Sequence, residues 1–139
     1  MEPATDLLNK LKMERDWNMS CIFTDKETVV VDNGANLRPE EIKFYTQAYE
    51  DRDVTVGEGF FVNNVHFDVH RFHPPLIYGR RGGPEDGEGI ALVRYKPRNP
   101  SDAGETYQYL LATYLLPILS PKAVPQMVKF CETNTGNPE

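Results

Sequence analysis

The fold is decided by two neighbouring stretches, YQYLLATY at residues 107–114 and KAVPQMVKFCET at residues 122–133. The first stretch is strongly apolar and is typical of a central β-strand. In the second, the apolar residues recur at i, i+3, i+4 and i+7, the spacing of one buried helix face: Val124, Met127, Val128 and Cys131. A buried strand that leads into an amphipathic helix predicts a sheet with a helix packed on one face.

The rest of the chain shows the same alternation of helical and strand-like patterns. We expect helices at residues 4–14 and 39–50, and strands at 19–23, 28–31, 60–62, 66–72, 76–78, 90–95 and 107–114. Pro39 suits a first helical position, and Glu40 and Glu41 suit the positive end of a helix dipole. The sequence therefore predicts an α+β fold. It has a central antiparallel β-sheet of six to seven strands, the N- and C-terminal helices on one face and the middle helix on the other.

Alternation within residues 66–72 predicts which side chains are exposed. Phe67 and Val69 fall on one side of this strand, whereas His66, Asp68 and His70 fall on the other. Phe72 departs from the pattern because it joins the polar side. Two segments outside the regular elements, residues 79–89 and 96–105, are rich in glycine, proline and polar residues and are expected to be exposed loops.

Length and charge limit the classes of function. The chain of 139 residues fits a single domain at 1–139, with a flexible tail at 134–139. Its net charge of −6 argues against a nucleic-acid binder, and its mean hydropathy of −0.53 argues against membrane insertion. The N-terminus does not read as a signal peptide, and two cysteines are too few for a disulfide framework. We therefore expect a cytoplasmic protein.

No strong catalytic or metal-binding motif is present, so we expect neither an enzyme nor a cofactor. The glycine-rich segment 79–83 lacks the Lys-Ser/Thr pair of a phosphate-binding loop. His66 and His70 point to the same side of a strand but lie about 13 Å apart, too far to share one metal ion unless the strand contains a bulge. These two histidines and His73 are either part of a contact face or solvated or structural residues. Cys21 and Cys131 are expected to pack in the core.

Two further features have both a structural and a functional interpretation. Arg71, Arg80 and Arg81 form a local basic group in an acidic chain. They are either ordinary solvated charges or a docking site for an acidic partner or a phosphate headgroup. Trp17 either packs between helix and sheet or provides a stacking platform for a ligand.

The order of elements resembles the profilin family over nearly the whole chain. Profilins have an N-terminal helix, a β-hairpin that ends in a glycine-containing bend, and a helix opened by a Thr-Pro-x-Glu-like segment. Here the bend is at residues 32–34 and the helix opens at residues 38–42. An aromatic-rich strand at 59–63 and a strand that ends in Arg71 follow, as in the family. The final apolar strand again leads into an amphipathic C-terminal helix.

The resemblance implies a protein that binds monomeric actin, regulates filament assembly and has no catalytic activity. It implies a binding face on the strands that follow the middle helix, together with the C-terminal helix. Carried over by position, the actin-binding residues would be Phe61, His66, Asp68, Arg71, Arg80, Arg81, Lys122 and Lys129. The apolar segment 115–119 would either add a hydrophobic anchor or pack in the core. The long loops 79–89 and 96–105 would lie at the edge of this face.

Other activities of the family are expected to be weak or absent here. Binding of proline-rich proteins needs exposed aromatic rings on the terminal helices and the first hairpin. The corresponding positions hold Leu7, Leu8 and Val30, so polyproline binding would require Trp17 or Phe130 to rebuild the groove. Phosphoinositide binding is unfavourable at a net charge of −6, although the arginines keep it possible locally.

Two other functional classes fit the same arrangement of helices and strands. A sensor or scaffold module of the PAS or roadblock type would need a deep apolar pocket or a dimer edge. A small enzyme would need a concave pocket around His66, Asp68, His70 and Arg71. We expect a monomer located in the cytoplasm and on the cytoskeleton.

Overall fold

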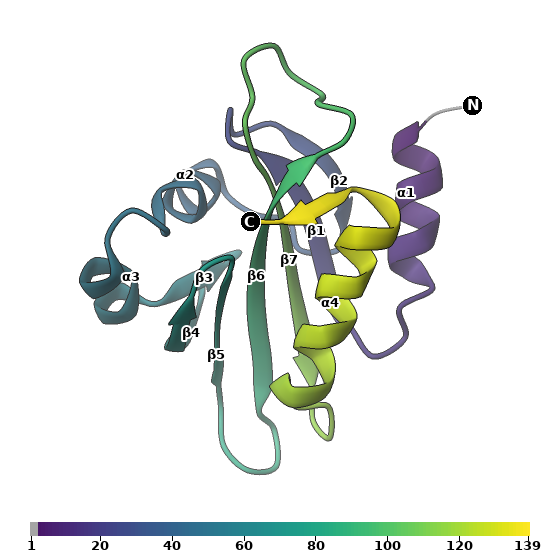
Figure 1. Ribbon diagram of the computed structural model, residues 1–139. Coiled ribbons are helices and arrows are strands. Elements are labelled where there is room, and N and C mark those ends of the chain that lie inside the picture. The colour runs from purple at the N-terminus through teal and green to yellow at the C-terminus, as the bar shows by residue number, and fades with distance from the viewer. Residues whose placement is uncertain (1–2) are drawn as a thin grey trace.

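A computed structural model describes residues 3–139 of the chain (Figure 1). The elements in chain order are α1 (Pro3–Lys12), β1 (Met19–Thr24), β2 (Val29–Asn33), α2 (Pro39–Gln47), α3 (Arg52–Glu58), β3 (Phe60–Val62), β4 (Val65–His73), β5 (Leu76–Arg81), β6 (Glu88–Pro97), β7 (Gln108–Leu115), α4 (Ser120–Asn134) and β8 (Gly136–Pro138). No helix within residues 3–139 combines the length and apolar character needed to cross a bilayer.

The strands form one antiparallel sheet in the order β2-β1-β7-β6-β5-β4-β3, with β8 paired to the far end of β6. The terminal helices α1 and α4 cover one face of this sheet, and α2 and α3 lie on the other side (Figure 1). This arrangement confirms the predicted α+β fold. β7 is central, as its apolar sequence predicts, and it is buried along all but its last residue.

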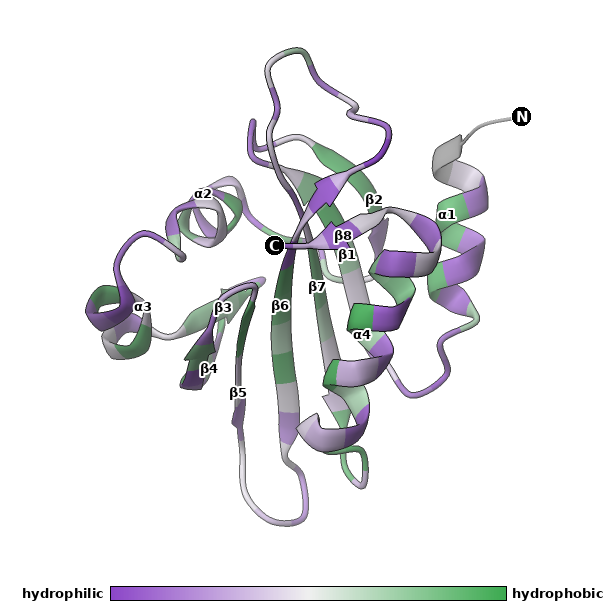
Figure 2. Cartoon of the chain, in the orientation of Figure 1, coloured by the Kyte–Doolittle hydropathy of each residue, from purple (hydrophilic) through white to green (hydrophobic). Residues whose placement is uncertain are grey.

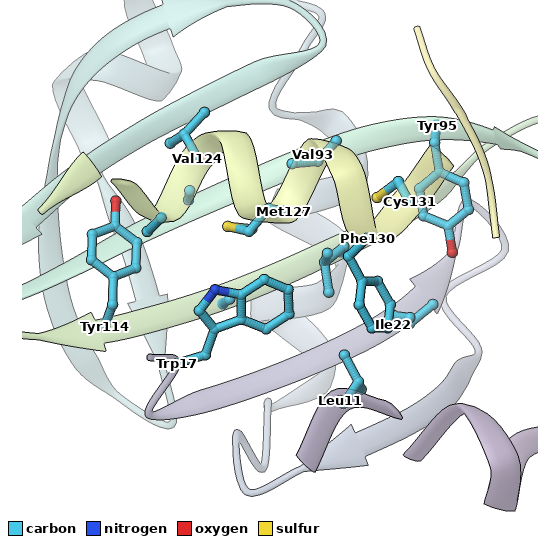
Figure 3. Packing of buried hydrophobic residues seen from close by; sticks show 14 of the residues in the cluster. Leu11, Trp17, Ile22, Val93, Tyr95, Tyr114, Val124, Met127, Phe130 and Cys131 are labelled. Atoms are coloured by element: carbon cyan, nitrogen blue, oxygen red, sulfur yellow. The ribbon is translucent and has the colours of Figure 1, made fainter. Parts of the chain in front are cut away.

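The face under α4 is filled by side chains from the helix and from β1, β6 and β7. Figure 3 shows Met127 and Phe130 of α4 pointing toward the sheet, beside Trp17 and Ile22. Leu11 of α1 completes this core from the other helix. The hydropathy colouring agrees, because the middle of β6 is a continuous apolar run, as expected for a strand covered on both faces (Figure 2). Burial of side chains on both sides of the sheet is the main stabilising term of the fold.

The opposite face, under α2, contains a cluster of aromatic rings. Tyr45 of α2 lies 4.8 Å from Phe60 and 5.8 Å from Phe23, measured between ring centroids. Such edge and tilted contacts between rings add to the energy of burial. The Tyr45 hydroxyl also donates a hydrogen bond of 2.6 Å to the Phe61 carbonyl, which satisfies an outward-facing group on the edge strand β3. This cluster fixes the position of α2 against the sheet.

Glu41 ties the start of α2 to the turn between β3 and β4. Its carboxylate accepts hydrogen bonds from the backbone N–H groups of Arg38, Asn63 and Asn64 at 2.7–2.9 Å. Both asparagines have positive φ, at 47° and 71°, a conformation that asparagine tolerates well. Glu41 therefore stabilises a helix start that lacks a side-chain cap at Arg38.

Two elements were not anticipated. The helix α3 follows Asp51, whose carboxylate accepts a hydrogen bond from the Val54 N–H at 3.2 Å. The tail 134–139, which we expected to be flexible, instead contains β8, and Gly136 pairs with Pro97 there. The tail is held because β5 pairs only with residues 88–93 of β6 and leaves the rest of that edge free.

The loop between β6 and β7 also lies elsewhere than predicted. Arg98 donates hydrogen bonds to the carbonyls of Glu132 and Thr135, and Asp25 accepts two from residues 106 and 107. This loop is therefore beside the end of α4 and the β1–β2 turn, at the opposite end of the sheet from the start of α4 (Figure 1). Only the loop between β5 and β6 lies near the start of α4.

A β-bulge in β4 explains the position of Phe72. The pairing with β5 shifts between Val69 and Arg71, so His70 is an extra residue. Beyond the bulge the alternation resumes in the opposite phase, and Phe72 packs into the aromatic side of the core. Gly79 faces the bulge at close range, because a Cβ atom there would lie 1.7 Å from the Asp68 carbonyl oxygen.

Candidate partner-binding face

One side of β4 is not covered by a helix, and the same side of β5 is covered only in part. The α4 helix packs on β6, β7 and β8, whereas α3 packs on β4 from the opposite side. Side chains that point from β4 away from α2 and α3 are therefore exposed, and they are polar: His66, Asp68, Arg71 and His73. We call this surface, together with His70, Phe61 of β3, and Tyr78 and Arg80 of β5, the bare face.

The bare face contains a basic cavity of about 370 Å³. The cavity is lined by residues from β4, β5 and the first turn of α4: His70, Arg71, Tyr78, Gly79, Arg80 and Ser120. Strand pairing brings them together, since Arg71 lies opposite Tyr78 and Asp68 lies opposite Arg80. The bulge at His70 turns this histidine into the same cavity.

The arginines of the basic cavity are available to a partner. Neither Arg71 nor Arg80 forms an ion pair within the part of the chain that the structure describes. Burial raises the pKa of the nearby Tyr114 hydroxyl, and the charge of Arg80 acts in the opposite direction. The same hydroxyl lies 2.7 Å from Ser120 Oγ, which fixes that side chain at the cavity wall. The arrangement can bind an anionic group such as a carboxylate.

Phe61 and His66 form the other end of the bare face. They are paired across β3 and β4, with ring centroids 4.9 Å apart, and 39% of Phe61 is exposed. His66 Nε2 lies 2.9 Å from the Glu58 carbonyl oxygen at the end of α3, and Nδ1 lies 3.9 Å from Asp68 Oδ1. The predicted residues Phe61, His66, Asp68, Arg71 and Arg80 thus lie along one surface.

Arg81 does not belong to this surface. Successive side chains of a strand point to opposite faces, so Arg81 lies on the α2 side while Arg80 lies on the bare face. Its guanidinium contacts the Glu88 carboxylate at 2.9 Å and lies over the Phe67 ring, 5.5 Å from the centroid. Asn18 donates a further hydrogen bond to Glu88 at 2.9 Å. Arg81 therefore has a structural role, and the basic group expected from three arginines contains two.

Lys122 and Lys129 point away from β4 and β5. Lys122 pairs with Asp16 at 3.2 Å, in the linker after α1. Lys129 lies two turns further along the same side of α4, where its charge partly offsets the burial and the Asp16 charge that raise the pKa of Glu14. Both lysines thus face α1, which lies across α4 from the basic cavity.

Trp17 and Phe130 are closed within the core. Trp17 is 7% exposed and contacts Phe130 edge to face at 5.6 Å, while its indole N–H donates to Gln126 at 3.2 Å (Figure 3). Leu7 and Leu8 of α1 and Val30 of β2 pack partly against the same cluster. The groove that contains Leu7 and Val30 is otherwise lined by polar residues: Asp6, Lys10, Asn99, Ser101, Gln108, Asn134 and Thr135.

The histidines and cysteines do not assemble into a reactive site. Within residues 3–139 there is no group of three or more His, Cys, Asp or Glu side chains placed to hold a metal ion. Cys21 and Cys131 are buried on opposite sides of the sheet. Burial raises the pKa of both thiols, to about 12 for Cys131, so neither is an activated nucleophile.

The architecture is similar to that of several solved protein structures. The chain superposes on Acanthamoeba castellanii profilin IA with a TM-score of 0.75 over 94% of both chains, at 18% sequence identity. The chain has the profilin fold. A profilin from Schizosaccharomyces pombe gives a TM-score of 0.70 over 95% of this chain and 96% of that one, at 19% identity. No protein-family model and no curated protein sequence matches the chain.

Within this profilin fold, the sequence did not reveal two residues of the basic cavity. The sequence pattern predicts only that Tyr78 lies in a strand, although its position two residues before Arg80 places both on one side of β5. Ser120 precedes the expected helix start at 122, but α4 begins at Ser120 itself. The signal for Tyr78 was available from alternation, whereas Ser120 required knowledge of how α4 meets the sheet.

Proposed function

We propose that the bare face binds an actin monomer and that the protein thereby regulates filament assembly. The observation that carries the proposal is the basic cavity on a chain of profilin fold, in which Arg71 and Arg80 form no ion pair with any residue of the described range 3–139. The resemblance of the sequence to profilins implies binding through this surface. By occupying one end of the monomer, the protein would block nucleation and still permit addition at the other end.

Charge supports this assignment. In a chain of net charge −6, two arginines that form no ion pair among residues 3–139 are gathered in one cavity and make a local positive site. Such a site favours an acidic patch on the partner and fixes its orientation, and it speeds association more than it adds to affinity. The exposed Leu119, directly before Ser120 of the cavity wall, supplies an apolar contact beside it, since this leucine is 48% exposed.

The same geometry supports a binding protein rather than an enzyme or sensor. The interior between sheet and α2, where a PAS-like sensor would hold its ligand, is filled by fully buried rings such as Phe23, Tyr45 and Phe60. We expect a cytoplasmic monomer without catalytic activity. Polyproline binding should be weak or absent because Trp17 and Phe130 are buried. Phosphoinositide binding should be weak because Arg81 is engaged by Glu88.

Titration of fluorescently labelled actin monomers with the folded protein tests the proposal. Saturable binding at micromolar to tens-of-micromolar protein, together with slower spontaneous polymerisation of actin, is the expected result. Absence of binding in this range, by protein with a cooperative unfolding transition, would reject the proposed function.

Reversal of one charge locates the site. Arg71→Glu should weaken actin binding by an order of magnitude or more, because truncating or reversing a desolvated charge contact costs about 2–5 kcal/mol. Arg52→Glu makes the same change on α3, on the other side of the sheet, at an exposed position. It should leave the affinity within about twofold of the wild type, since an exposed charge distant from an interface is screened by solvent and salt.

A further inference from the structure

A second pocket lies at the edge of the sheet, where α2 meets the β3–β4 turn. It has a volume of about 290 Å³ and is lined by Glu40, Glu41, Phe44, Phe61 and Asn64. Phe61 also belongs to the bare face, so this edge pocket borders the proposed partner-binding surface. The basic cavity at the start of α4 shares no lining residue with it.

The walls of the edge pocket are two phenylalanine rings that are held from behind. Phe44 contacts the buried Phe60 edge to face, with centroids 6.4 Å apart. Phe61 is backed by His66 at 4.9 Å and keeps its outer surface exposed. Rings held in this way offer a preorganised apolar and π surface to an incoming side chain, at little cost in conformational entropy.

The charge of the edge pocket is entirely negative. Glu41 is buried, and its oxygens already accept three backbone hydrogen bonds. Glu40 is exposed and forms no ion pair among residues 3–139, and none of the lining residues is basic. A side chain with an apolar stem and a terminal cation matches both the aromatic walls and the negative charge of the edge pocket. The stem covers the two phenylalanine rings, and the cation lies beside Glu40.

We propose that the edge pocket receives an arginine side chain of the partner that docks on the bare face. Arginine fits better than lysine, because its planar guanidinium stacks on aromatic rings and is less strongly hydrated than an ammonium group. The naming of the partner rests on the proposed function. The acidic edge pocket and the basic cavity then give the bare face two ends of opposite charge, which permit one orientation of the partner and penalise the reverse.

Two measurements test this proposal, and the first does not need actin. N-acetyl-arginine methylamide is titrated against the protein while NMR shifts of Phe44, Phe61 and Asn64 are followed. We expect saturable shifts at millimolar ligand, which Phe44→Ala abolishes and N-acetyl-norleucine methylamide does not reproduce. Equal shifts with the norleucine compound, or shifts confined to other residues, would overturn the proposal, since they would remove the role of the cation or the pocket.

The second measurement is actin affinity. Glu40→Lys should weaken it about tenfold, whereas Asp53→Lys, the same charge change in the first turn of α3, should leave it unchanged. If the wild type binds actin and Glu40→Lys binds equally well, the edge pocket does not contact the partner and the proposal fails. If the wild type does not bind actin but the arginine compound still shifts Phe44, the proposed function fails and the preference of the pocket for arginine stands.

Discussion

The two sides of β4 and β5 differ in what covers them. On one side, α2 and α3 close over Phe67, Val69 and Ile77, which are almost completely buried. On the other side α4 packs on β6 and β7, so the alternate residues of β4 remain exposed and polar, while those of β5 are half-buried. A single pair of strands therefore supplies a core on one side and a binding surface on the other.

Arg80 and Arg81 show what this difference means for individual residues. Arg81 neutralises Glu88, which is only 3% exposed, and so contributes to the stability of the interior. Arg80, one residue earlier, lines an open cavity and has no carboxylate partner within residues 3–139. Neighbouring arginines in the sequence thus have separable roles, and the predictions below test that separation.

The largest loss of stability is expected from a substitution in β5 that breaks its pairing with the bulge of β4. Gly79→Val places a branched side chain where the Cβ alone would lie 1.7 Å from the Asp68 carbonyl oxygen. Neither backbone can move without breaking the pairing at the bulge. We expect a loss of more than about 3 kcal/mol in the free energy of unfolding, measured by chemical denaturation.

The matched control is Gly83→Val, in the loop between β5 and β6. A Cβ there approaches nothing closer than 3.5 Å, so the change should stay within about 0.5 kcal/mol. Equal destabilisation by the two variants would show that Gly79 is not constrained by the bulge.

The next largest loss of stability should distinguish the two sides of β5. Glu88→Ala leaves Arg81 and Asn18 without their acceptor, and we expect about 2 kcal/mol of destabilisation, less than for a fully buried pair because Arg81 is partly exposed. Arg80→Ala should change the unfolding free energy by less than about 0.5 kcal/mol. Denaturant titration of both variants measures the difference.

Actin affinity, in contrast to stability, should depend on Arg80 and not on the Arg81–Glu88 pair. Arg80→Ala is expected to weaken binding about tenfold, while folded Arg81→Ala should bind like the wild type. A loss of affinity in Arg81→Ala at temperatures where it remains folded would contradict the division between the two sides.

Much of the fold was predictable because periodicity is a local property. The helix face that contains Val124, Met127 and Cys131, and the apolar run of β7, specify burial without knowledge of distant residues. Three features could not be predicted in this way. The bulge at His70 depends on Gly79 in the next strand, β8 depends on β5 being short, and Glu41 acts on a turn more than twenty residues away.

The candidate site was predictable only in part, for the same reason. Alternation along β4 placed His66 and Asp68 on the exposed side, but it assigns Arg71 to the side of Phe67 and Val69, and only the bulge at His70 brings Arg71 to the bare face. Applied to β5, alternation would have separated Arg80 from Arg81. The positions of Lys122 and Lys129 depended on the rotation of α4 about its axis, which is fixed by Trp17 and Asp16 through contacts with Gln126. No local pattern contains that information.

The closed interiors should lose stability at alkaline pH. Burial raises the pKa of Cys131 and of Tyr109 to about 12 in the folded protein, on the α4 and α2 sides of the sheet respectively. In the unfolded chain these groups ionise near pH 8.5 and 10. The contribution of these two groups to the free energy of unfolding is therefore complete below about pH 8.5 and is lost as the pH rises toward 12.

Urea unfolding measured from pH 7 to pH 11 checks this expectation, with Cys131→Ala as the control. The variant is less stable overall because it leaves a cavity, but its stability should fall less steeply above pH 9. Parallel curves for the variant and the wild type would mean that the Cys131 thiol is not protected by burial.

The smallest effect, a change in tryptophan emission close to zero, is expected when a proline-rich peptide is added to the α1–α4 side of the sheet. Trp17 is the sole tryptophan, and it is packed against Phe130 with its N–H bonded to Gln126. A proline-rich peptide needs exposed rings on which to stack, so adding it should leave the tryptophan emission unchanged. Denaturant unfolding, which exposes Trp17, verifies that the emission responds to its environment. A saturable shift with the peptide would mean that α1 and α4 separate to admit a ligand, and the contrast between a closed α1–α4 side and a bare β4–β5 side would no longer hold.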